Sequence, residues 1–94
     1  MEEFANKIVG IIKAQAPSYD GRMWEPSVGS IAYEFGIGEK EAIAALDLAI
    51  DKMLKSGDYV DTVGGLYHKE TMDEYERQLM DFVAYQLAKE HGEE

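Results

Sequence analysis

Apolar residues recur with helical spacing in much of this chain, returning every three or four positions as on one face of a helix. Four segments share this spacing: residues 2–16, 26–35, 39–56 and 72–90. The residues at the ends of these segments also indicate helices. Pro17 follows the first segment, and Gly36 and Gly57 follow the next two. Thr71 and Glu74 have the spacing of a capping box at the start of the last. We therefore expect four helices.

Between the third and fourth of these segments the pattern changes to strict alternation, which is typical of strands. Residues 58–63 alternate, residues 66–68 return, and Gly64-Gly65 between them is a two-residue hairpin signal. Residues 22–24 are short and extended, and they predict a first strand that places Trp24 in the core. Pro26 fits the first position of the second helix, where its missing N–H costs nothing.

The large apolar residues predict the core and, by difference, the outward surface of the third helix. The expected core consists of Trp24, Ile31, Ile43, Leu46, Ile50, Leu54, Tyr75 and Phe82. With a step of about 100° per residue, the face of the third helix opposite these core residues carries both charged and apolar side chains. It carries Glu41, Ala44, Ala45, Leu48, Lys52 and Lys55.

This order of elements resembles the winged helix-turn-helix superfamily across nearly the whole chain. The residues that carry the resemblance are IAYEFGIGEKEAIAALDLAIDKMLKSGDYV followed by GGLYHK. The resemblance implies a mainly α fold with a small β wing, in the order α-β-α-α-β-β-α, with an extra C-terminal helix. It also implies a nucleic-acid-associated or transcription-regulatory role, because the third helix of such proteins commonly enters the DNA major groove.

Length and composition predict one globular domain covering residues 1–94. The hydrophobic fraction of 46% and the charged fraction of 30% are ordinary for a folded protein. The chain has no cysteine, which fits a reducing compartment. No apolar run approaches membrane-spanning length, and the first residues are acidic where a signal peptide would be basic. We expect a cytoplasmic protein.

Charge opposes DNA binding, because 19 acidic residues stand against 9 basic ones and the net charge is −10. If the chain binds DNA, the cations expected to contact phosphates are Arg22, Lys52, Lys55 and Lys69. The predicted outward face of the third helix has no Arg, Asn or Gln to read base edges. We therefore expect weak binding that depends little on DNA sequence.

The same outward face suggests an alternative in which the domain binds a protein. Ala44, Ala45 and Leu48 form a small apolar patch that a partner could cover. A blander interpretation is an alanine-rich helix whose Leu48 is shielded within the domain. A third interpretation is an acidic DNA mimic, although the acids are spread around the chain instead of standing in a phosphate-like row.

The last predicted helix carries two apolar stripes. The inner stripe is Met72, Tyr75, Leu79, Phe82, Val83 and Gln86. The second consists of Met80, Ala84, Leu87 and His91. Two stripes indicate two neighbours, and the second neighbour we expect is the same helix of another copy, in a homodimer. The alternative is that the first and third helices cover both stripes.

The sequence contains no constellation of catalytic residues. Its two histidines, His68 and His91, lie in different predicted elements, and no metal-binding spacing is present. Gly36-Ile37-Gly38 lacks the preceding strand and the third glycine of a nucleotide fingerprint. We expect neither an enzyme nor a cofactor.

Overall fold

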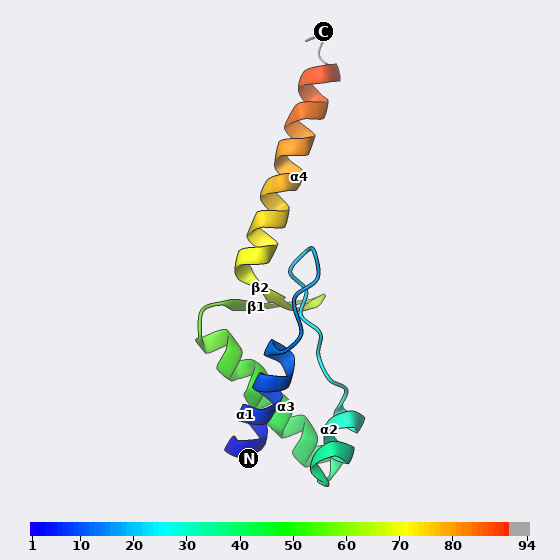
Figure 1. Ribbon diagram of the computed structural model, residues 1–94, viewed down its shortest axis with the longest axis vertical. Coiled ribbons are helices and arrows are strands. Elements are labelled where there is room, and N and C mark those ends of the chain that lie inside the picture. Colours follow the sequence, from blue (N-terminus) through cyan, green and yellow to red (C-terminus); the bar gives the residue numbers. More distant parts are fainter. Residues whose placement is uncertain (91–94) are drawn as a thin grey trace.

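The computed structural model describes residues 1–90, which form a small helical body, a hairpin and one long projecting helix (Figure 1). The elements are α1 (Glu2–Lys13), α2 (Val28–Phe35), α3 (Glu39–Lys55), β1 (Tyr59–Thr62), β2 (Gly65–His68) and α4 (Lys69–Glu90). The fold is mainly helical with a two-stranded antiparallel sheet, as predicted. His91, which the sequence placed on the second stripe of the last helix, lies outside the described residues.

The predicted first strand is reduced to a single bridge in which Arg22 pairs with Tyr67 of β2. The Met23 N–H donates to the Leu66 carbonyl at 2.8 Å, so this segment lies along β2. Met23 is buried, and Trp24 is 51% exposed. The prediction of a core Trp24 is wrong because neighbouring residues of an extended chain point to opposite sides, and Met23 has the inner place.

The body is held together by close contact between α1 and α3. The buried side chains are Ala5, Ile8 and Ile12 of α1 and Ala42, Ala45, Ala49 and Met53 of α3. The predicted inward face of α3 is therefore wrong by roughly a quarter turn. Ile43 is 42% exposed, and Leu46, Ile50 and Leu54 are only half-buried. On α3 the core-facing residues are three alanines and Met53, and the other large apolar side chains flank them.

The short helix α2 confirms its predicted C-terminal stop. Gly36 follows it with φ 64°, a left-handed conformation that glycine adopts at no steric cost. At the other end, the Ser27 hydroxyl accepts a hydrogen bond from the Ser30 N–H at 3.1 Å. Ser27 is therefore the N-cap, and Pro26 precedes the helix instead of occupying its first position.

The hairpin turns one residue earlier than its two glycines suggest. Thr62 pairs with Gly65, so the turn is Val63-Gly64 and Gly65 begins β2. The chain then passes directly from β2 into α4. The Thr71 N–H lies 3.4 Å from His68 Nδ1, so His68 takes the capping role that the sequence assigned to Thr71.

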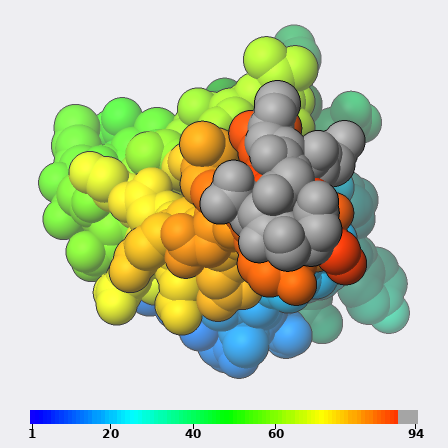
Figure 2. Space-filling model, turned by 90° about the horizontal axis from the view of Figure 1, so that it is seen from above, coloured from blue at the N-terminus to red at the C-terminus, as the bar shows by residue number. Residues whose placement is uncertain are grey.

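The helix α4 leaves the body and projects along the longest axis of the molecule (Figure 1). Its first turns pack on β2 and on the loop before Arg22, where the rings of Tyr19 and Tyr75 meet edge to face at 5.4 Å. The rest of α4 extends away from the body, which lies behind the helix in the view from above (Figure 2). Phe82, a predicted core residue, is 59% exposed, so that prediction is wrong.

Candidate functional site

The outward face of α3 is mixed in charge and has two carboxylates at its centre. Its exposed residues include Lys40, Ala44, Asp47, Asp51 and Lys55, which follow one another at helical spacing. Ile43 stands beside them. Asp47 and Asp51 would face the phosphates of a duplex laid along this helix, and like charges repel. This face therefore does not form a positive strip.

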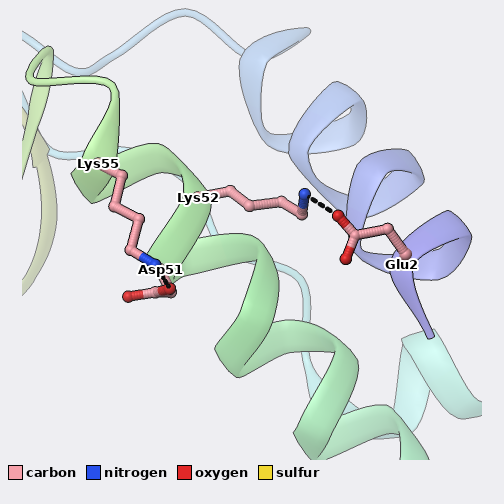
Figure 3. A network of polar contacts seen from close by, with 4 residues as sticks. All are labelled: Glu2, Asp51, Lys52 and Lys55. Carbon is pink, nitrogen blue, oxygen red and sulfur yellow. Dashed lines mark hydrogen bonds and ion pairs between the residues drawn. The ribbon is translucent and has the colours of Figure 1, made fainter.

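Two of the four cations predicted to contact nucleic acid form ion pairs at the surface of the body (Figure 3). Lys52 points towards α1 and forms an ion pair with Glu2. Lys55 pairs with Asp51 of its own helix at 3.0 Å. Lys52 therefore does not belong to the outward face, and the carboxylate of Asp51 partly neutralises Lys55.

The other two predicted cations lie at the hairpin. Arg22 is exposed beside β2, where its guanidinium and the Glu25 carboxylate both lie close to Gly65. Lys69 is the first residue of α4, and it lines a shallow hollow with Asp58, Asp73 and Arg77. Each of these two cations therefore has acidic neighbours.

The predicted protein-binding patch on α3 does not exist as an open surface. Ala45 is fully buried in the core, so its assignment to an interface is wrong. Leu48 is half-buried, and of the three residues only Ala44 is exposed. The error has the same cause as the misplaced core face, since α3 is turned so that Ala45 faces the core.

On α4, by contrast, the predicted interface residues Met80, Ala84 and Leu87 are all exposed, with Met80 at 66% and Leu87 at 51%. Part of the predicted inner stripe is exposed as well. We call the open apolar surface the α4 face; it consists of Leu79, Met80, Phe82, Val83 and Leu87. Neither α1 nor α3 covers this face, so the alternative in which they shield both stripes is wrong.

A sequence signal for this surface was available. Eight of the ten residues 79–88 are apolar, so this stretch of α4 is apolar on nearly every side. A helix of that kind is normally buried. Here it stands clear of the body, and the described residues leave most of its apolar side chains exposed.

A hollow at the base of α4 continues the α4 face towards the body. Its volume is about 350 Å³, and the hairpin forms its other wall. It is lined by Asp20, Thr62, Tyr67, Met72, Tyr75, Glu76 and Leu79. We call it the basal hollow. A second apolar hollow lies between α1 and α2, beside the exposed Trp24.

Comparison with family models, with curated proteins and with solved structures found no match. Within residues 1–90, no helix has both the length and the hydropathy needed to cross a membrane. The same residues contain no cluster of three or more side chains suited to hold a metal ion.

Proposed function

We propose that this chain is a winged helix-turn-helix protein that works as a homodimer, in which α4 joins two copies and each copy carries one surface made of α3 and the β1–β2 wing. The order of helices, bridge and hairpin supports the fold. The role proposed for the pair is regulatory, with the two α3-and-wing surfaces presented to a common ligand.

The observation that carries this proposal is the exposed α4 face. Its five side chains leave roughly 500 Å² open in each copy, at the upper end of the largest apolar patches on ordinary monomers. Pairing two copies would bury about 1,000 Å², near the lower bound for a specific interface. A two-fold homodimer is the commonest way to cover such a surface.

Concentration-dependent stability tests the pairing. Because only the folded dimer buries the α4 face, the unfolding temperature should rise with protein concentration. Leu79→Glu should abolish that dependence by placing a charge within the interface. Ala88→Glu, on the far side of the same helix, is the matched control and should retain it. Equal behaviour of the two variants would refute pairing through this face.

For the ligand of the α3-and-wing surface, a protein is better supported than duplex DNA. Asp47 and Asp51 stand at the centre of the exposed α3 face, and Lys52 and Lys55 have carboxylate partners within the body. Ile43 and Ala44 supply apolar contact area on the same face. Such a mixed surface suits a protein partner that brings both apolar and basic groups.

Association with nucleic acid is the second candidate, and the placement of Arg22 and Lys69 at the wing favours it. With Lys52 turned towards α1, three predicted phosphate contacts remain: Arg22, Lys55 and Lys69. Three contacts give a salt slope of about −2.7 for duplex DNA. Binding should be weak and should depend little on base sequence, because α3 exposes no Arg, Asn or Gln.

A titration of a short labelled duplex at low salt decides between the two ligands. If DNA is the ligand, Lys55→Glu with Lys69→Glu should abolish binding, whereas Ile43→Ser, which removes apolar area without adding charge, should leave it unchanged. Lys7→Glu with Lys13→Glu on α1 controls for the change in net charge, because both double variants lower it by four. No binding by the wild type at micromolar concentrations would exclude the DNA candidate and leave the protein-partner proposal standing.

A further inference from the structure

We infer that the two copies pair antiparallel through α4, so that the end of each helix lies against the basal hollow of the other copy. This inference rests on the proposed homodimer and specifies its geometry. The α4 face is centred near Val83, and an antiparallel pair centred there sets residues 87–89 of one copy beside residues 77–79 of the other. The basal hollow lies at that position, because Leu79 and Glu76 line it.

Charge favours this direction of pairing. Residues 69–76 contain four acids and one base, a net charge of −3. A parallel pair would set two such runs side by side, and like charges in contact destabilise a helix pair. In an antiparallel pair centred near Val83 the two acidic runs lie apart, and only Glu76 at the end of each run comes beside the partner's last turn, which contains Lys89.

The basal hollow has the chemistry to receive that helix end. Met72, Tyr75 and Leu79 form an apolar wall, and Leu79 at the end of that wall would contact the partner's Leu87. Asp20 and Glu76 bring two carboxylates to the same hollow, within reach of the partner's Lys89. A parallel pair would leave the hollow of each copy unfilled, because the partner's helix end would lie at the far tip of the projecting helix.

The helix dipoles also favour antiparallel pairing. Antiparallel neighbours set the positive end of one helix beside the negative end of the other, and parallel neighbours set like ends together. The antiparallel arrangement also carries each helix end to the hairpin of the other copy. The end of the partner helix then packs against the hairpin wall of the basal hollow, which is formed by Thr62 and Tyr67.

Cysteine cross-linking tests the direction, and the chain contains no native cysteine to interfere. Glu76→Cys and Lys89→Cys chains are co-expressed and treated with a short bifunctional maleimide. The antiparallel pair should give the mixed product, residue 76 joined to residue 89. In that pair, two copies of residue 76 lie about 20 Å apart at 1.5 Å per residue, so neither variant alone should cross-link efficiently.

The outcomes separate this inference from the proposal beneath it. Efficient cross-linking of Glu76→Cys to itself would show a parallel pair and overturn the inference while leaving the homodimer intact. A dimer by mass with no cross-linked product would also overturn the inference. A monomer by mass for the untreated wild-type protein would overturn the homodimer itself.

A charge exchange gives a second readout without cysteines. Lys89→Glu should weaken dimerisation by about fivefold, the effect of two exposed ion pairs per dimer. Adding Glu76→Lys to the same chain should restore the affinity by reversing both partners. A further weakening by Glu76→Lys in place of restoration would contradict the antiparallel arrangement.

Discussion

Lys52 of α3 forms an ion pair with Glu2 of α1, and this contact lies at the edge of the buried alanine face of α3. The pair shows which way α3 is turned. The side of α3 that meets α1 is next to the side that carries Lys52, so this cation reaches along the surface towards α1 (Figure 3). The orientation of α3 therefore decides which residues remain for binding.

The close contact of α1 and α3 predicts that enlarging an alanine there is costly. Ala45→Leu inserts three carbons into a site with no exposed surface, and we expect a loss of about 1–3 kcal/mol in the free energy of unfolding. Ala44→Leu, one residue earlier and exposed, should change stability by less than about 0.5 kcal/mol. Urea denaturation of both variants measures the difference. Equal losses would mean that α3 is not turned as described.

The loop that supports the base of α4 depends on Gly21. Its φ is 95°, and a Cβ there would lie 2.7 Å from the backbone nitrogen of Met72. Gly21→Ala should therefore destabilise the protein by more than about 1 kcal/mol, through strain and displacement of α4.

Gly10→Ala is the matched substitution for Gly21→Ala. A Cβ at Gly10 in α1 meets nothing within 4 Å, so this change should stabilise the protein by about 0.5–1 kcal/mol. Thermal unfolding of the two variants should move in opposite directions. A harmless Gly21→Ala would show that the loop does not hold α4 closely.

The sequence predicted the elements well because their signals are local. The N-terminal and C-terminal limits of α3 follow from Gly38 and Gly57, and Gly36 ends α2 as expected. The inward face of α3 could not be predicted from the size of its apolar residues. Whether Ala45 or Ile43 faces the core depends on how closely α1 approaches α3. That distance is set only when the two helices pack together.

For the candidate surfaces too, some features could be predicted from the local sequence, and others depend on the tertiary structure. The apolar stripe that contains Met80 and Leu87 is visible in the sequence, and the structure shows that no described residue covers it. The exposure of Phe82 was not predicted, since only the structure shows that α4 leaves the body after its first turns. The pairing of Lys52 with Glu2 joins residues far apart in the chain and carries no local signal.

Tyr59 at the start of β1 predicts a loss of stability at alkaline pH. Burial raises the pKa of its phenol above the ordinary value of 10.0, and the nearby Asp58 carboxylate raises it further. Below that value the phenol is neutral in both the folded and unfolded chain. Above it the unfolded chain releases the proton first, so stability should fall as the pH rises past 10.0.

Tyr59→Phe removes this titration and leaves the other tyrosines in place. The stability of the wild type relative to the variant should be constant from about pH 7 to 9 and should fall above about pH 10. Urea denaturation across that range measures it. A difference that stays constant throughout would contradict the burial of this phenol.

If α4 joins two copies, the protein has the mass of a dimer in solution. Light scattering of the wild-type protein at tens of micromolar should give twice the chain mass of 10.6 kDa. Val83→Glu, at the centre of the α4 face, should give the single-chain mass with its helical circular dichroism largely retained. A wild-type mass of 10.6 kDa at that concentration would contradict the account.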